Sequence, residues 1–152
     1  MVAASAIRLK LLPPPIKGTS AFVFSRLNTL AKITSASDFS HYNRDYDAKS
    51  EMILVFLYDA HHQLIGHAST TSRTASVVVF SIRNLIETAL RVGSQSMLLM
   101  HNHPSGDASP SQADITQTKS ILQVLHPLQI TLHDHIIYAE SKTFSFKLNG
   151  LI

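Results

Sequence analysis

Side chains that can bind a metal ion gather in the middle of the chain, at His101, His103 and Asp114. Two neutral imidazoles and one carboxylate are a ligand set that holds zinc and leaves a fourth position for water. Bound zinc lowers the pKa of that water toward about 7, which produces a nucleophile at neutral pH. Residues of these types would therefore support hydrolysis at a metal ion.

The elements around these residues would place them together. His101 and His103 follow the apolar run 96–100, which predicts a buried strand, and residues i and i+2 of a strand face the same side. Asn102 would then point to the opposite side. The segment 104–110 is polar and turn-like, and Ser111 and Asp114 fall at the start of a predicted helix. A strand end beside a helix start is a common location for an active site in an α/β protein.

Each half of this pattern also has a simpler explanation. Ser111-x-x-Asp114 resembles a helix capping box, with aspartate in place of the usual glutamate. A His-x-His pair alone is more often structural or solvent-exposed than metal-binding. The two patterns in this order and spacing are much more specific than either alone, and Ser111 could cap the helix while also serving catalysis.

The remaining pattern predicts an α/β domain in which helices alternate with buried strands. Ser81 is the predicted start of one helix and Gly93 its stop. The predicted strands are 52–58, 63–71, 96–100, 130–139 and 143–147, with 76–80 as a short strand or extended connection, and the predicted helices are 81–92 and 111–125. We predict a flexible arm over residues 1–20, a weakly helical extension over 21–50 and the main domain over 51–152.

Composition narrows the function classes. Of the 152 residues, 45% are hydrophobic, enough for a sizeable core, and the absence of cysteine excludes disulfides, thiolate metal ligands and a thiol nucleophile. We expect a cytoplasmic protein without a membrane span. The net charge of +3 comes from scattered basic residues, which supports nucleic-acid binding only weakly.

The motif resembles the JAMM signature of JAB/MPN domains, in which His-x-His is followed by seven residues, Ser, two residues and Asp. Here the seven residues are 104–110, and the flanking residues resemble the RadC-like branch of these domains. The resemblance extends to Asp134-His135, to Phe144-Ser145-Phe146 and to Gly150, and it covers roughly residues 50–152.

The resemblance implies a mixed β-sheet flanked by helices in three layers, similar to the cytidine deaminase fold. It implies that His101, His103 and Asp114 are ligands of Zn²⁺ and that Ser111 stabilises an oxyanion. The family also uses a glutamate ahead of an early strand as general base, and Glu51 is the natural match. The chain's other glutamates, Glu87 and Glu140, fall on a helix and in a late turn, where surface positions are expected.

The function implied is a zinc metallopeptidase or isopeptidase that cleaves an amide bond in a protein or peptide substrate. The alternative is a DNA-repair-associated or non-catalytic binding module. Longer RadC-like chains carry a helix-hairpin-helix region before this domain, but residues 1–50 contain only Gly18 and lack the paired Gly-x-Gly hairpins. The adjacent His-Asn-His letters do not match an HNH nuclease, whose residues are widely spaced. A zinc deaminase needs a cysteine pair that this chain lacks.

A second His-x-His lies on the predicted strand 130–139, where alternation places His133 and His135 on one face. We do not expect a separate metal site there, because no third ligand is spaced nearby. Asp134 and His135 could support the site or a substrate groove, or form structural hydrogen bonds. Asp107 is expected to brace its loop, and the His61-His62 pair to lie in a solvated turn.

Overall fold

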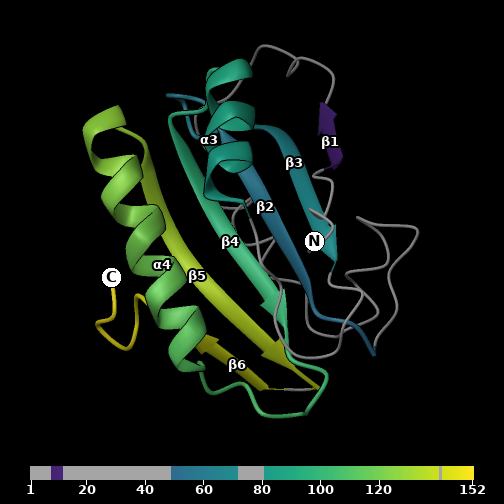
Figure 1. Cartoon of the computed structure of the whole chain (residues 1–152). Helices are drawn as coiled ribbons and strands as arrows, with labels where there is room; N and C mark the ends of the chain where they lie inside the picture. Colours follow the sequence, from purple (N-terminus) through teal and green to yellow (C-terminus); the bar gives the residue numbers. More distant parts are fainter. Residues whose placement is uncertain (1–7, 12–48, 72–80, 141) are drawn as a thin grey trace.

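A mixed six-stranded sheet with the strand order β1-β3-β2-β4-β5-β6 forms the centre of the protein (Figure 1). The structure is a computed structural model that describes residues 8–11, 49–71, 81–140 and 142–152. Its elements are β1 (Arg8–Leu11), β2 (Met52–Tyr58), β3 (Leu64–Thr71), α3 (Ile82–Arg91), β4 (Ser96–Asn102), α4 (Gln112–Leu125), the 3₁₀ turn η2 (His126–Leu128), β5 (Thr131–Ala139) and β6 (Lys142–Ser145).

The central strands β2 and β4 are buried along their whole length, which explains their continuous apolar sequences. They pair antiparallel with each other, and β2 also forms a hairpin with β3. In the turn of that hairpin, the Asp59 carboxylate accepts hydrogen bonds from the backbone N–H groups of His61 and Gln63. The strands predicted for 52–58 and 63–71 are therefore confirmed, as is the turn between them.

Both described helices pack on the same face of the sheet (Figure 1). Leu85 and Ala89 of α3 and Ile121 and Leu125 of α4 share one core cluster with inward-facing residues of β2 and β4. Ser81 caps α3 as predicted. The α/β class and the mixed sheet are confirmed, whereas a third layer on the other face would have to come from outside the described residues.

The connection from β4 to β5 determines where the site forms. These two strands are parallel, and α4 crosses over between them. The loop 103–111 leads from the end of β4 to the first turn of α4, so both lie at the same edge of the sheet (Figure 1). His101 therefore comes close to Asp114, although the two residues belong to different elements.

One prediction about β5 is wrong. Met97 pairs with Leu132, but the next residue, Leu98, pairs with Asp134, so His133 is an extra residue in a β-bulge. The bulge breaks the two-residue alternation, and His133 lies at Ser96 on the opposite face from His135. The two histidines thus do not share a face.

Part of the arm predicted for residues 1–20 lies among the described residues. Arg8–Leu11 pairs antiparallel with β3, so these residues form an edge strand. The rest of that arm, most of the extension predicted over 21–50, and the segment 76–80 lie outside the described residues.

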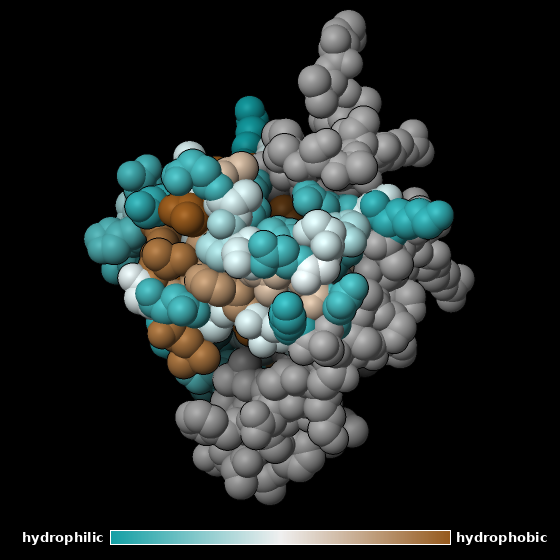
Figure 2. All heavy atoms as spheres, turned by 90° about the horizontal axis from the view of Figure 1, so that it is seen from below, coloured by the Kyte–Doolittle hydropathy of each residue, from teal (hydrophilic) through white to brown (hydrophobic). Residues whose placement is uncertain are grey.

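The described surface has an apolar side. On the face seen in Figure 2, hydrophobic residues gather toward the side where α4 and the C-terminal segment lie in Figure 1, and hydrophilic residues cover much of the rest of the described surface in that view. Among the described residues, the exposed large hydrophobic side chains are Leu90 of α3, Val124 of α4, Leu128 of η2 and Leu148 of the C-terminal segment. None of the described helices has the length and hydrophobicity to span a membrane.

Candidate metal centre

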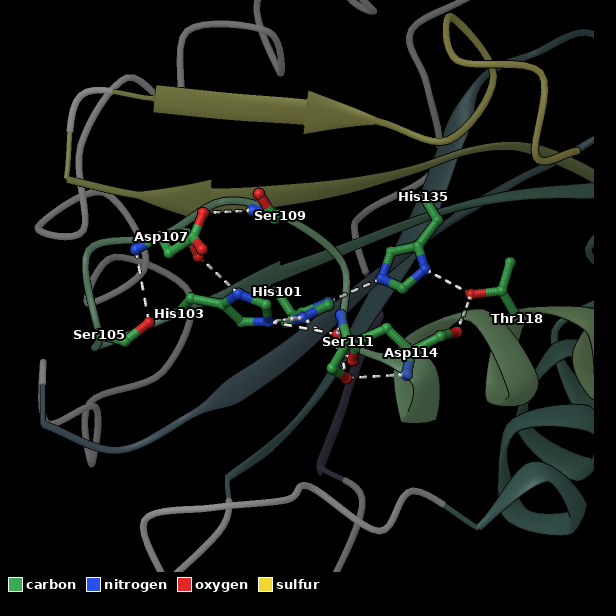
Figure 3. A network of polar contacts seen from close by, with 9 residues as sticks. All are labelled: His101, His103, Ser105, Asp107, Ser109, Ser111, Asp114, Thr118 and His135. Atoms are coloured by element: carbon green, nitrogen blue, oxygen red, sulfur yellow. Dashed lines mark hydrogen bonds and ion pairs between the residues drawn. The ribbon is translucent and has the colours of Figure 1, made fainter.

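The three predicted ligands meet at the end of β4 and the start of α4 (Figure 3). His101 Nε2 lies 3.4 Å from Asp114 Oδ1, His103 Nε2 lies 3.4 Å from Asp114 Oδ2, and the two Nε2 atoms are 2.8 Å apart. Together these side chains could hold a metal ion, and among the described residues no second group of three does so.

The capping box predicted at Ser111 is present and also orients Asp114. Ser111 Oγ accepts a hydrogen bond from the Asp114 N–H at 3.2 Å. The Ser111 N–H and the Ser111 hydroxyl both donate to Asp114 Oδ2, at 2.7 and 2.6 Å. The cap therefore holds the carboxylate toward the histidines, so the structural and the metal-binding interpretations of this motif describe the same geometry.

A backbone carbonyl holds His103, the less buried of the two histidines. Its Nδ1 lies 2.8 Å from the carbonyl oxygen of Asp107, which can only accept a hydrogen bond. Nδ1 must therefore carry the proton, and in the neutral ring the lone pair of Nε2 faces Asp114. Asp107 braces the loop as predicted, because its carboxylate accepts the Ser109 N–H at 2.9 Å. Gly106, with φ of +81°, forms the turn between them.

Side chains hold His101, the more buried of the two histidines. It is 3% exposed, and its Nδ1 lies 2.7 Å from Nε2 of His135. His135 Nδ1 lies 2.7 Å from the hydroxyl of Thr118, which donates to the Asp114 backbone carbonyl at 2.7 Å. The aromatic ring of Phe146 stacks on His135, with ring centroids 4.5 Å apart. His101 is thus supported by β5, by α4 and by the C-terminal segment.

The charges of these groups differ with their burial. Burial lowers the pKa of His101 to about 3 and that of His135 to about 4, so both rings are neutral near pH 7. The hydrogen bond with Asp114 raises the pKa of His103 against the effect of its burial. Burial alone would raise the pKa of Asp114, but its contacts with His103, His101 and Ser111 lower it, so this carboxylate is ionised.

The donor set fits a divalent cation. Ligand atoms about 2.0–2.1 Å from a tetrahedral zinc ion are roughly 3.3–3.4 Å apart. Each histidine Nε2 has this spacing to a different oxygen of Asp114, and one ligand atom from each of the three residues lies within 4.8 Å of the others. To hold one tetrahedral ion the carboxylate would turn one oxygen toward it, and the two Nε2 atoms would separate by about half an ångström. The carboxylate is ionised, and the hydrogen bonds at the two Nδ1 atoms leave Nε2 of each ring as the nitrogen that faces the site. The 2.8 Å contact between the two Nε2 atoms needs one proton, which a metal would displace. Three electron-rich atoms pointing at one place favour a cation there.

The three candidate ligands line a cavity of about 400 Å³. The predicted catalytic residues, Glu51 and Ser111, line the same cavity as the three ligands. Glu51 is half-buried immediately before β2, and its charge is among the lesser causes that raise the pKa of His103. All five residues singled out by the sequence therefore share one cavity.

The other polar residues have mainly structural contacts. Asn102 lies on the far side of β4, as predicted, where its side chain accepts from the Met52 N–H at 2.8 Å and donates to the Ser50 carbonyl at 3.1 Å. Asp134 accepts hydrogen bonds from the Ser145 hydroxyl and the Lys147 N–H, which holds the C-terminal segment. The exposed His61 lies in the hairpin turn.

Sequence reasoning missed Thr118. Its hydroxyl joins the Asp114 carbonyl to His135, and the residue is 1% exposed. The available signal was a threonine on the packing side of α4, in line with Ile121 and Leu125. A buried hydroxyl needs a partner, and this one has two.

Comparisons with known proteins agree with the geometry. Residues 33–151 match the family described as the RadC-like JAB domain, so the match begins before the domain start predicted at residue 51. A UPF0758 protein of Rhodobacter capsulatus is 34% identical over 103 residues, which are 68% of this chain and 48% of that protein. A UPF0758 protein of Chlorobium chlorochromatii is 32% identical over 127 residues, 82% of this chain and 57% of that protein.

A UPF0758 protein of Ruegeria pomeroyi is 36% identical over 104 residues, 68% of this chain and 46% of that protein. The chain thus spans about half the length of the curated relatives that it matches, and their names state no activity. The family match covers most of the sequence, including His101, His103 and Asp114 and the strands β4 and β5. The chain therefore belongs to the RadC-like JAB domain family.

Proposed function

We propose that this protein is a zinc-dependent hydrolase that cleaves an amide bond in a protein or peptide, as a peptidase or isopeptidase. The observation that carries the proposal is the convergence of His101, His103 and Asp114 in a cavity that Glu51 and Ser111 also line. A metal site closed on all sides would suit a structural role, whereas one that opens into a cavity suits catalysis.

Zinc is the metal that best suits the donor set. Two imidazole nitrogens and one carboxylate oxygen are ligands that zinc accepts in catalytic sites. When bound, zinc supplies an activated water at neutral pH and polarises a carbonyl oxygen. The rest of the chemistry falls to side chains of the cavity.

Glu51 is the proposed general base. Its carboxylate would accept a proton from the attacking water and pass it to the leaving amine. Its place at the cavity and its electrostatic effect on His103 support this role. Ser111 would direct its hydroxyl toward the oxyanion that develops on the carbonyl oxygen. In this structure the same hydroxyl donates its only proton to Asp114 Oδ2, so it would have to turn from the carboxylate to the oxyanion.

The test is peptide cleavage by the zinc-loaded full chain and by Glu51→Gln. We expect the variant to keep its zinc and to lose about 100- to 10,000-fold in cleavage rate, the usual contribution of a general base. Glu87→Gln is the matched control, because Glu87 is exposed on α3 and pairs with Arg83 away from the cavity. Cleavage by Glu51→Gln at the rate of the parent protein would contradict the assigned base.

A non-catalytic or DNA-associated role gives a different result in the same experiment. In that case the zinc-loaded protein would cleave no peptide of a diverse library, and DNA affinity would survive His101→Ala. That affinity would also fall steeply with salt, as expected for contacts to phosphates. Such an outcome would overturn the proposed hydrolase.

A further inference from the structure

Beyond the three ligands, a directional chain of hydrogen bonds runs behind His101 (Figure 3). It links His101 Nδ1 to His135 Nε2, His135 Nδ1 to the Thr118 hydroxyl, and that hydroxyl to the Asp114 carbonyl, and the donor–acceptor distance of each bond is 2.7 Å. His135 and Thr118 are 5% and 1% exposed, so water does not compete freely for these bonds.

The direction of the chain follows from its last member. A backbone carbonyl has no proton to give, so the Thr118 hydroxyl must donate its only proton to the Asp114 carbonyl. Thr118 Oγ1 then acts as acceptor toward His135, whose Nδ1 must carry a proton. In the neutral ring, His135 Nε2 is left as an acceptor. His101 Nδ1 must therefore donate to it, and His101 Nε2 keeps its lone pair on the side of Asp114 and His103.

We propose that His135 is a positioning residue that, together with Thr118, selects the tautomer of His101 in which Nε2 faces the metal. The opposite tautomer would place a proton at Nε2, where it would compete with a cation. The inference rests on the proposed metal site, but the hydrogen bonds that carry it are those of the protein without metal.

The chain also ties two ligands together. It begins at His101 on β4, passes through β5, and ends on the backbone of Asp114 itself. Phe146 stacks on the His135 ring and limits its rotation. One network therefore sets the tautomer of His101 and fixes the position of His101 relative to the first turn of α4, which carries Asp114.

Replacements at His135 test the proposal by metal affinity. His135→Leu removes the acceptor for His101, and we expect Zn²⁺ binding to weaken by about 10- to 100-fold, as for other groups that support metal ligands. His135→Gln is the rescuing variant, because its amide oxygen can accept from His101 and its amide nitrogen can donate to Thr118. We expect this variant to bind Zn²⁺ within about threefold of the parent, since both bonds have a substitute.

Two further variants complete the set. Thr118→Val keeps the shape but removes the hydroxyl that sets the direction, so we expect weaker Zn²⁺ binding, while Thr118→Ser should bind like the parent. His133→Leu is the matched control, because His133 lies on β5 but contacts Ser96 on the other face. We expect no change in its Zn²⁺ affinity.

The tautomer itself can be measured in the metal-free full chain. Long-range ¹H–¹⁵N spectra of ¹⁵N-histidine-labelled protein distinguish a protonated ring nitrogen from a bare one. We expect His101 to carry its proton on Nδ1 in the parent and in His135→Gln, and to lose that preference in Thr118→Val. This readout holds even where His135→Leu fails to fold, and it does not need a metal.

Two results would overturn the proposal: a proton on His101 Nε2 in the metal-free parent, or Zn²⁺ affinity in folded His135→Leu equal to that of His133→Leu. A parent protein that binds no Zn²⁺ while His101 shows the expected tautomer would contradict the proposed function instead. The two failures are therefore distinguishable.

Discussion

His101 near the end of β4 and His103 just beyond that strand stand two residues apart, yet the protein holds them in different ways. His101 is buried, and two side chains from other elements support it. His103 is half-buried, and a carbonyl of its own loop supports it. We call these the inner and the outer ligand. The inner ligand is arranged by the tertiary structure, whereas the outer ligand depends on the conformation of residues 103–107.

The difference suggests a division of tasks. The inner ligand gains a defined tautomer, at the cost of burying three polar side chains, His101, His135 and Thr118, that all need partners. The outer ligand borders the cavity and the predicted catalytic residues, where a small movement of the loop would suffice to separate the two Nε2 atoms around an ion. The site therefore combines a rigid part, His101 with its buried partners, and an adjustable part, His103 with its loop.

The largest expected effect is on the stability of the metal-free protein. His101→Ala leaves His135 without its donor and creates a cavity, so we expect the free energy of unfolding to fall by about 2–4 kcal/mol. His103→Ala removes a half-buried ring, and we expect a loss below about 1 kcal/mol. Urea denaturation with a chelator present measures both. Equal losses would break the distinction between inner and outer ligand.

The pH dependence of metal binding should involve only the outer ligand. In the metal-free protein the pKa of His103 is raised by Asp114, whereas that of His101 is about 3. Below the pKa of His103 a metal must displace one proton, so affinity should fall by about tenfold per pH unit as the pH decreases. Zn²⁺ titrations at several pH values measure the slope. Displacement of two protons near pH 6 would contradict the neutral state of His101.

A smaller effect is expected from the loop that holds the outer ligand. Gly106 has φ of +81°, and an added Cβ would lie 3.2 Å from Oε1 of Glu140. Gly106→Ala should therefore cost about 1–2 kcal/mol of stability and weaken metal binding severalfold, because the loop carries the acceptor for His103. Thermal denaturation and Zn²⁺ titration measure the two effects.

Gly93→Ala is the control for that variant. Gly93 has φ of +68° with open space around its Cβ position, and it follows α3 away from the site. We expect a similar backbone cost with no change in metal affinity. A loss of affinity in Gly93→Ala as large as in Gly106→Ala would show that the loop has no specific role.

Local sequence patterns predicted the strands and helices that carry the ligands. The apolar runs of β2 and β4, the cap at Ser81 and the capping box at Ser111 are all properties of neighbouring residues, and the structure contains each of them. The spacing of His101, His103 and Asp114 was informative for the same reason. A strand end, a loop and a helix turn determine their relative positions.

The errors arose where distant segments meet. The edge strand Arg8–Leu11 pairs with the distant strand β3, and its own sequence, with two charged residues, does not predict it. The bulge at His133 inserts a residue that simple alternation does not anticipate. Thr118 gains its role from contacts with β5, which no pattern within α4 shows. Each case depends on tertiary packing, which is absent from a local window of sequence.

The measurement that tests the central claim most directly is the zinc content of the dialysed full chain after Zn²⁺ loading. We predict one tightly held ion per chain in the parent protein and in His133→Ala, and its loss in His103→Ala, which leaves the buried half of the site in place. A parent protein without bound zinc, or a His103→Ala variant that retains it, would contradict the metal centre at His101, His103 and Asp114.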